Sequence, residues 1–374
     1  MDKVRLGIIG LGNIGSLHIR NVKGQRVPEV ELTAVCDIDP KRLEWARDEL
    51  GDDVQRFDAA EKMYDSGLVD AVLIGTPHYD HPPLAIKAFE KGLHVLTEKP
   101  AGVYTKQVRQ MNEAAEKSGK VFGIMFQMRT SGVYQKIKEL IDSGEVGEIR
   151  RITWICTAWY RTEFYYRSGG WRATWGGEGG GVLMNQCPHN LDMWQHLFGL
   201  PKRIRAACAF GKYHDIEVED DVVATMEYEN GAMATFITTT GEAPGSDRLE
   251  IACDGGLITV GHNEVKLRRN RRFVSGHLRE AQTTFGKPEC WDCTIGAPTR
   301  LATGQPHADV LQSFANGILK GDKLIAPGED GIRGLELANA MLLSAWSNGE
   351  WIDVPVDEER FYEKLQEQIK TSTF

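Results

Sequence analysis

The first third of the chain alternates short apolar runs with stretches of helical periodicity. The apolar runs cover residues 4–9, 32–36, 71–74, 93–96 and 121–126, and helical patterns lie between them. Fully apolar strands that alternate with helices are typical of a parallel sheet covered on both faces. The pattern therefore predicts an α/β domain over residues 1–126, with a doubly wound parallel sheet of the Rossmann type.

Beyond residue 126 alternating polar and apolar positions take over. A helix is predicted at 134–141, followed by strands at 149–157, 203–208, 222–228, 232–239, 249–252, 257–260 and 265–267. An Asn230-Gly231 pair separates two alternating runs, which is typical of an antiparallel hairpin. Residues 127–374 are therefore predicted to form an α+β domain. Two helices, at 309–319 and 329–347, are expected to close the chain, and the last of them (near 329–348) is expected to pack back on the first domain.

Composition narrows the class of protein. The 374 residues are 41% hydrophobic and 26% charged, which is ordinary for a globular protein. The net charge of −9 argues against a general nucleic-acid binder, which would show a basic face. The absence of an apolar run of about 18 residues predicts no membrane-spanning helix. Met1-Asp2-Lys3 leads directly into a strand and leaves no room for a secretory signal, so we expect a cytoplasmic protein.

The cysteines give little reason to expect a metal. Seven of them are scattered along the chain, as expected for reduced structural thiols. Cys290 and Cys293 form the one pair with ligand spacing. A zinc site would need a second pair or histidines at ligand spacing, and none follows. We therefore predict no metal site.

The strongest local motif is the glycine loop from Gly10 to Gly15, which follows the first strand and opens a helix. In this context the glycines allow a tight turn, close approach of a pyrophosphate and close packing of helix on strand. Asp37 ends the second strand, where an acid meets the ribose 2′-hydroxyl, and no arginine follows it immediately. NAD is therefore preferred to NADP, although a glycine turn in a non-binding domain stays open. The predicted contacts of this half of the site are Gly10, Gly12, Asn13, Ile14, Gly15, Asp37 and Ile38.

Two further segments follow strands of the same sheet, at the edge where ligands bind in open α/β folds. The first contains Thr76, Pro77, His78 and His81; its histidines could contact a ligand or serve as capping and packing residues. The second is Glu98-Lys99-Pro100. A lysine with a pKa lowered by burial could accept a proton from a substrate hydroxyl. Taken alone, however, a Glu-Lys pair at a strand end is more often a solvated turn.

A glycine-rich, aromatic tract at 168–181 is expected to form a flexible loop leading into a helix at 182–194. Asn185, His189 and Asp192 are spaced i, i+4 and i+7, which predicts that they share one helical face. Tryptophan and arginine in such a loop suit a sugar, since Trp stacks on its apolar face and Arg bonds its hydroxyls. The alternative is a helix with one buried, fully hydrogen-bonded histidine.

Together these motifs resemble the family of glucose–fructose oxidoreductase, inositol dehydrogenase and the rhizopine-catabolism proteins (Gfo/Idh/MocA). The resemblance rests on Gly10–Gly15, Asp37, Thr76-Pro77 with His81, Glu98-Lys99-Pro100, the 179–192 block and the stretch entering 335–346. It implies hydride transfer between NAD(P) and a secondary alcohol, with Lys99 and His189 sharing the proton transfer and Asn185 and Asp192 supporting them. It also implies cofactor contacts from Thr76, Pro77, His78, His81, Glu98, Lys99 and Gln127. The second domain is then expected to carry an open, mostly antiparallel sheet that serves as an oligomer interface.

One departure from the family pattern changes the expected substrate. Asn185 stands where members similar to inositol dehydrogenase carry a catalytic aspartate, and an amide cannot accept a proton at neutral pH. We therefore expect an NAD-dependent dehydrogenase that acts on a pyranose or glycoside. The enzyme is expected to be a dimer or tetramer. Its sugar contacts are expected from Arg129, Arg161, Tyr165, Trp171, Arg172, Asn185 and His189. The alternatives are a redox-neutral lyase or glycosidase with tightly held NAD, a non-catalytic NAD- or sugar-sensing regulator, and an inositol dehydrogenase.

Overall fold

A computed structural model of the chain describes residues 2–261, 264–297 and 303–374. Within them, the N-terminal part forms a six-stranded parallel sheet in the order β3-β2-β1-β4-β5-β6, the strand order of a dinucleotide-binding fold. The predicted doubly wound sheet is confirmed. Its strands are β1 (Val4–Ile9), β2 (Val30–Cys36), β3 (Gln55–Phe57), β4 (Ala71–Ile74), β5 (His94–Thr97) and β6 (Phe122–Ile124).

Of the helices between these strands, all but the third lie close to the predicted positions. They are α1 (Asn13–Lys23), α2 (Pro40–Leu50), α3 (Ala60–Tyr64), α4 (His81–Glu90) and α5 (Thr105–Ser118). The sequence pattern missed β3 and α3, because elements of three and five residues carry no measurable periodicity.

The C-terminal part contains a nine-stranded sheet, counted over the described residues, in the order β14-β13-β12-β11-β7-β10-β9-β8-β15. Only the β7–β10 pair among these neighbours is parallel, so the mostly antiparallel sheet is confirmed. The strands are β7 (Ile149–Cys156), β8 (Arg203–Phe210), β9 (Glu219–Glu227), β10 (Met233–Thr239), β11 (Asp247–Cys253), β12 (Gly256–Gly261), β13 (Glu264–Asn270), β14 (Cys290–Ile295) and β15 (Ile352–Asp353).

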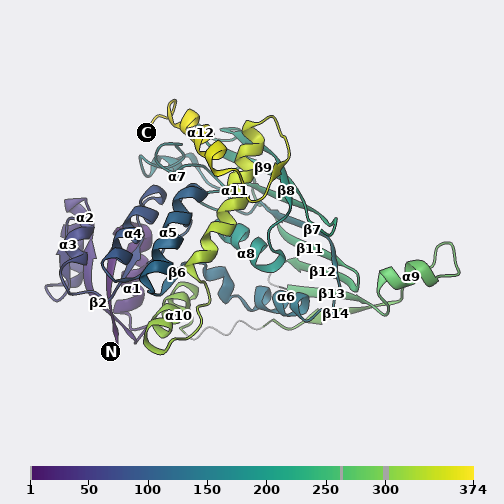
Figure 1. The fold of residues 1–374 in the computed structure, drawn as a ribbon, viewed down its shortest axis with the longest axis horizontal. Helices are drawn as coiled ribbons and strands as arrows, with labels where there is room; N and C mark the ends of the chain where they lie inside the picture. Colours follow the sequence, from purple (N-terminus) through teal and green to yellow (C-terminus); the bar gives the residue numbers. More distant parts are fainter. Residues whose placement is uncertain (1, 262–263, 298–302) are drawn as a thin grey trace.

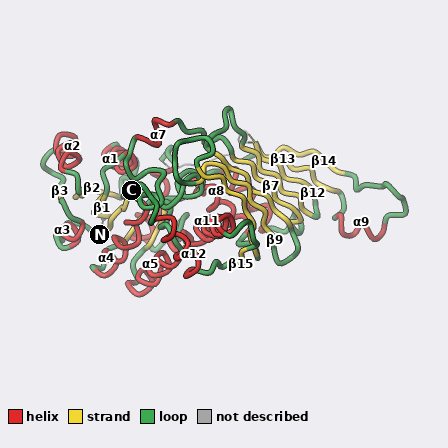
Figure 2. Tube along the Cα trace, turned by 90° about the horizontal axis from the view of Figure 1, so that it is seen from above, coloured by secondary structure: helices red, strands yellow, loops and turns green. Residues whose placement is uncertain are grey.

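Helices cover one face of this sheet. Helices α6 (Gly132–Asp142), α8 (Pro188–Phe198) and α11 (Gly331–Trp346) lie against it (Figures 1 and 2). Along β9 and β10 buried residues alternate with partly or fully exposed ones, as expected for a sheet with one packed face. Trp154, Phe236 and Trp194 form the aromatic centre of this layer, with ring centroids 5.7 to 6.5 Å apart.

The C-terminal helices differ from the prediction in two ways. Helix α10 (Pro306–Lys320) was assigned to the second domain, but Leu311 and Phe314 pack into the core of the parallel sheet. The predicted end of the chain was also wrong, because α12 (Glu358–Ile369) follows α11. Helix α11 does lie against the first domain, since the side chain of Asn339 hydrogen-bonds the backbone of Thr105 and Val103.

Strands β13 and β14 extend into an arm that carries α9 (Val274–Glu280) far from the rest of the molecule (Figures 1 and 2). Every residue of α9 is at least partly exposed. Cys290 and Cys293 lie on β14, and all seven cysteines are unpaired. Within the described ranges, no cluster of His, Cys, Asp and Glu could hold a metal, and no helix is long and apolar enough to cross a membrane.

Candidate active site

The glycine loop connects β1 to α1 with an open space above it. A Cβ atom on Gly15 would lie 2.0 Å from the carbonyl oxygen of Gly10, so helix and strand approach too closely for a side chain. A Cβ atom on Gly12 would meet nothing within 4 Å. No side chain caps the first turn of α1, which leaves its backbone N–H groups to an anion. The loop therefore fits a pyrophosphate.

Asp37 lies at the carboxyl end of β2, and its Oδ2 atom accepts a hydrogen bond from the backbone of Leu11 at 2.7 Å. This bond fixes the glycine loop relative to the carboxylate that is predicted to meet the ribose. The neighbouring Ile38 is 90% exposed, so its side chain is free to cover an adenine ring.

Sequence reasoning missed Arg42 at this end of the site. Its guanidinium group donates hydrogen bonds to the backbone oxygen of Leu11 and to Ser16 Oγ, and it stacks on the Trp45 ring at 4.5 Å. The residues directly after Asp37 do not reveal Arg42, because it is the fifth residue along and only the helix α2 brings it back towards the loop.

The two histidines after β4 lie in different environments. His81 is fully buried, and its ring nitrogens lie 2.8 Å from the Pro100 oxygen and 2.9 Å from the Thr76 oxygen. It therefore ties two loops together, and the expectation that it contacts the cofactor is corrected. His78 lies nearer the second domain, with Nδ1 3.1 Å from the backbone oxygen of Glu178 and its ring in a T-shaped contact with Trp171. Burial lowers the pKa of both rings.

Thr76, which precedes Pro77, lies directly against the glycine loop. The Cβ position of Gly10 would be 3.0 Å from the backbone nitrogen of Thr76. The predicted cofactor contacts of Thr76 and Pro77 stay predictions that this arrangement supports.

Glu98 and Lys99 follow β5 and are held firmly, unlike a solvated turn. Glu98 is buried, with Oε1 2.7 Å from His18 Nε2 on α1. Burial opposes its charge, but the His18 hydrogen bond and the nearby cations outweigh burial and lower the pKa of Glu98 to about 2. Lys99 Nζ donates a hydrogen bond to the backbone oxygen of Asn185 at 2.7 Å. Burial lowers the pKa of Lys99, although Glu98 and Glu178 oppose this effect.

His189 lies in the first turn of α8 with one nitrogen bonded and the other unpaired. Its Nε2 atom lies 3.0 Å from the amide nitrogen of Gln127, whereas Nδ1 is buried and lacks a partner among the described residues. Burial and the nearby Lys99 charge lower the pKa of His189 to about 3, so the ring is neutral. An unpaired buried nitrogen costs free energy unless a ligand satisfies it. Within the described residues, His189 is therefore not the fully hydrogen-bonded core histidine of the alternative.

The predicted helical face of Asn185, His189 and Asp192 does not form. Helix α8 begins at Pro188, a favoured first helical residue, so Asn185 lies in the preceding turn. Asp192 is fully buried, and its carboxylate bonds Arg129 and Gln195.

Arg129 also has a different role from the expected one. It is 2% exposed at the side chain, and its guanidinium nitrogens lie 2.6 Å from Asp192 and 2.8 Å from Asp330. With two carboxylates as partners, Arg129 joins η2 (Gln127–Thr130) to α8 and to the start of α11. Arg129, predicted as a sugar contact, and Asp192, predicted to support the catalytic pair, are therefore both corrected to members of a structural ion pair.

The other four expected sugar contacts gather in one cluster. The guanidinium carbons of Arg161 and Arg172 lie 5.1 and 4.8 Å from the ring centre of Tyr165. Arg172 also stacks on Trp171 at 4.6 Å and donates to the Tyr165 hydroxyl at 3.1 Å. Burial is the main cause of the lowered pKa of Lys99, and the positive charges of Arg172 and Arg161 lower it further. The cluster offers stacked aromatic faces and hydrogen-bond donors to a ligand.

The glycine tract is packed, in contrast to the flexible loop that composition predicted. Cβ atoms at Gly179 and Gly181 would lie 2.2 Å from Val103 and 2.0 Å from the Glu219 backbone oxygen. Glu219 accepts hydrogen bonds from the backbone nitrogens of Gly181 and Leu183, and burial raises its pKa to about 7. These glycines therefore permit close approach of backbone to its neighbours.

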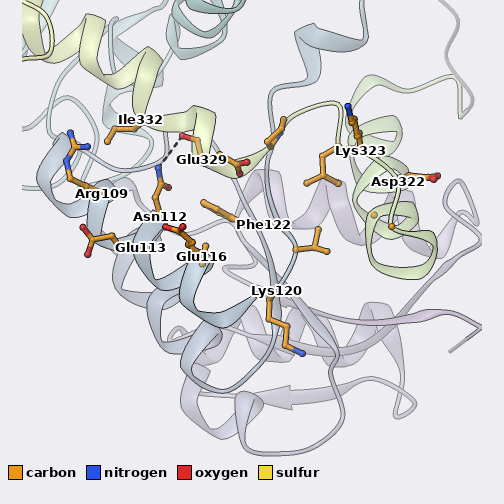
Figure 3. Close-up of a pocket in the computed structure, with 17 residues that line it drawn as sticks. Arg109, Asn112, Glu113, Glu116, Lys120, Phe122, Asp322, Lys323, Glu329 and Ile332 are labelled. Carbon is orange, nitrogen blue, oxygen red and sulfur yellow. Dashed lines mark hydrogen bonds between the residues drawn. The ribbon is translucent and has the colours of Figure 1, made fainter.

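A groove of about 1050 Å³ lies elsewhere on the surface, between α5, β6 and the loop after α10 (Figure 3). Asn112 donates a hydrogen bond to the Glu329 backbone oxygen across it, and Lys120 and Lys323 lie at its margins (Figure 3). None of the predicted site residues lines this groove.

Comparison with known proteins agrees with this architecture. The model of the "Oxidoreductase family, NAD-binding Rossmann fold" matches residues 4–126, and that of the "GFO/IDH/MocA C-terminal domain" matches residues 134–259. The chain is 26% identical to scyllo-inositol 2-dehydrogenase (NAD(+)) of Bacillus subtilis, over 96% of this chain and 98% of the relative. It is 25% identical to inositol 2-dehydrogenase of Rhizobium meliloti, over 91% and 96% of the two chains.

Among solved structures, the WlbA dehydrogenase from Bordetella pertussis, in complex with NADH and UDP-GlcNAcA, superimposes with a TM-score of 0.78. It is 27% identical, and the match covers 95% of this chain and 100% of that one. Two matched domain models, full-length relatives and a glycine loop that fits a pyrophosphate agree with one another. The chain belongs to the GFO/IDH/MocA family and is an NAD-dependent oxidoreductase with an N-terminal Rossmann domain.

Proposed function

We propose that this protein oxidises a secondary ring hydroxyl of a pyranose or glycoside, with Lys99 as the proton acceptor and His189 as a neutral hydrogen-bond donor. One observation carries the proposal. At the carboxyl edge of the parallel sheet, the partly buried Lys99 amine bonds the backbone oxygen of Asn185, and the neighbouring Gln186 donates a hydrogen bond to Tyr165 of the aromatic and arginine cluster. His189, which follows in the first turn of α8, carries the unpaired imidazole nitrogen. When bound, NAD accepts the hydride from the carbon that carries the hydroxyl.

The two residues have distinct tasks. We assign the Gln127 amide N–H as the donor to His189 Nε2, which puts the imidazole proton on Nδ1, from where it can be donated to the substrate oxygen. With a pKa of about 3, His189 does not act as the base at neutral pH. Burial lowers the pKa of Lys99 and so increases the fraction of neutral amine that can accept the hydroxyl proton.

The relatives support this substrate class. The similar proteins act on or bind inositols and a nucleotide-linked sugar acid, ligands that present secondary ring hydroxyls. Arg161 and Arg172 can bond hydroxyls while Trp171 and Tyr165 stack on the ring face. We place the inositols behind pyranoses because Asn185 replaces the family aspartate.

A Lys99→Ala variant tests the assignment. We expect a loss of roughly 100-fold or more in kcat, the usual contribution of a general base, with NAD affinity nearly unchanged. Activity is followed as NADH formation across pyranoses, glycosides and inositols, with NADP in parallel, and NAD binding is followed by calorimetry. Lys91→Ala is the matched control, because Lys91 is an exposed lysine paired with Asp65. Substantial activity in the Lys99 variant would remove Lys99 from its role.

A homo-oligomer and a cytoplasmic location remain part of the proposal. Val223 on β9 and Met233 on β10 are more than 40% exposed on the sheet, which suits burial against a second copy. The seven unpaired cysteines suit a reducing compartment. Light scattering at increasing concentration tests the oligomeric state.

A further inference from the structure

Glu178 is a buried carboxylate that none of the motifs predicted. It lies at the end of the glycine tract, 1% exposed, and accepts a hydrogen bond from the backbone nitrogen of Ala173 at 2.6 Å. Its second oxygen accepts a hydrogen bond from the side-chain amide of Asn185. A buried carboxylate is costly unless its charge is used or paired, and its nearest cation is Arg172, 3.7 Å away.

The hydrogen bonds connect Glu178 to the proposed base. Asn185 binds Glu178 through its side chain and Lys99 Nζ through its backbone oxygen. The chain Glu178–Asn185–Lys99 therefore joins a negative charge to the amine through one residue. The family resemblance implies that Asn185 stands where related dehydrogenases carry an aspartate. The Glu178 carboxylate, seven residues upstream, accepts a hydrogen bond from the side-chain amide of this asparagine.

The same carboxylate holds the sugar cluster. Ala173 has a positive φ of 55°, a region that residues other than glycine seldom adopt, and its N–H is the group that Glu178 binds. Trp171 and Arg172 directly precede Ala173. Glu178 thus fixes the backbone that carries two expected sugar contacts, and Asn185 links it to the proton acceptor.

We propose that Glu178 is a positioning residue that supplies the negative charge missing at Asn185, orients Lys99 through Asn185, and couples Lys99 to the Trp171–Arg172 turn. This inference rests on the proposed function of Lys99. The proposed role depends on the charge of Glu178 as well as on its hydrogen bonds. It therefore predicts a change in the pKa of Lys99, which loss of packing alone would not produce.

The charged and titratable groups around the pair set the direction of the expected shift. The groups that interact electrostatically with Lys99 or Glu178 are Glu98, Arg161, Arg172, His78, His189, His307, Tyr166 and Glu219. Burial lowers the pKa of Lys99, and Glu178 is one of two carboxylates that raise it. Removing the charge of Glu178 therefore lowers the pKa of Lys99.

A Glu178→Gln variant tests the charge. Because oxidation needs the neutral amine, the rising limb of the pH profile of kcat/KM is expected to move to lower pH. The plateau value of kcat is expected to fall by roughly 10–100-fold, as for loss of a hydrogen bond to a charged group. NMR titration of lysine labelled at Cε, with the Lys99 signal identified by its absence in Lys99→Ala, measures the same shift without substrate.

A charge swap tests whether the position of the carboxylate matters. Asn185→Asp alone places two carboxylates in contact and is expected to lower kcat. In the double variant Glu178→Gln/Asn185→Asp, the amide introduced at position 178 can donate to the carboxylate introduced at position 185 and still accept from the Ala173 N–H. We expect this variant to recover at least 10-fold in kcat over Glu178→Gln and to return the pH limb towards its original position.

Glu217→Gln is the matched control. Glu217 also holds the loop, accepting from the Trp175 backbone nitrogen at 3.0 Å and from Thr373, and its replacement is expected to lower the Tm without moving the pH limb. An unshifted Lys99 titration in Glu178→Gln, or a double variant no better than the single ones, would overturn the inference. If the unmodified protein oxidises no sugar, the proposed function fails, and the NMR titration still decides whether Glu178 controls the pKa of Lys99.

Discussion

Replacing Arg129 distinguishes a structural ion pair from a sugar contact. In Arg129→Met the aliphatic part of the side chain is kept, but the guanidinium group that binds Asp192 and Asp330 is lost. Both Arg129 and Asp192 are at most 2% exposed at the side chain, so water cannot take the place of the lost partner. Breaking such a buried pair costs about 3–5 kcal/mol, because one charge stays buried and uncompensated.

The expected loss of stability is large enough to measure directly. Domains of 150–250 residues lose about 2–4 °C in Tm per kcal/mol, which predicts a decrease of roughly 6–20 °C. The loss should be smaller at acidic pH, because burial raises the pKa of Asp192 and protonation then removes the uncompensated charge. Adding Asp192→Asn to the variant is expected to restore part of the Tm at neutral pH.

Thermal unfolding and steady-state kinetics are measured on the same preparations. Arg161→Met is the control, since Arg161 lies in the sugar cluster and forms no ion pair within the described residues; it is expected to raise the KM for the sugar with little change in Tm. For Arg129→Met we expect the KM of the folded protein to change less than twofold, within roughly 0.4 kcal/mol. A raised KM with an unchanged Tm would refute the structural role and restore Arg129 as a sugar contact.

Two further substitutions test the cofactor loop and the glycine tract. Asp37→Ala is expected to raise the KM for NAD by roughly 10–100-fold and to reduce the preference for NAD over NADP. The control Asp37→Asn keeps an acceptor for the Leu11 N–H, so it separates the effect of the charge from that of the loop geometry. Equal use of NADP by the unmodified protein would contradict this role of Asp37. Gly181→Ala places a Cβ 2.0 Å from the Glu219 backbone oxygen and is expected to destabilise the folded protein by about 1–3 kcal/mol. Gly170→Ala is the control, because its Cβ would meet no atom within 4 Å, and it should leave thermal unfolding unchanged. Equal effects of the two variants would favour a flexible tract.

The sequence by itself determined the architecture and the cofactor half of the site. The alternation of apolar strands and helices reports burial on both faces of a sheet, and it predicted the parallel domain. The glycine loop and Asp37 lie within one strand–helix–strand unit, so their spacing along the chain already fixes their arrangement in space.

The tertiary structure alone decided the other half. Composition predicted a flexible glycine tract, but only the neighbours at Val103 and Glu219 show that these glycines permit close packing. Helical spacing grouped Asn185 with Asp192, whereas the start of α8 at Pro188 and the ion pair with Arg129 separate them. The sequence did not predict a role for Glu178, because its partners Ala173 and Asn185 meet it only when the glycine tract packs. Local periodicity specifies which face of an element is buried, but the partner of a buried charge comes from another element and is fixed only when the chain packs.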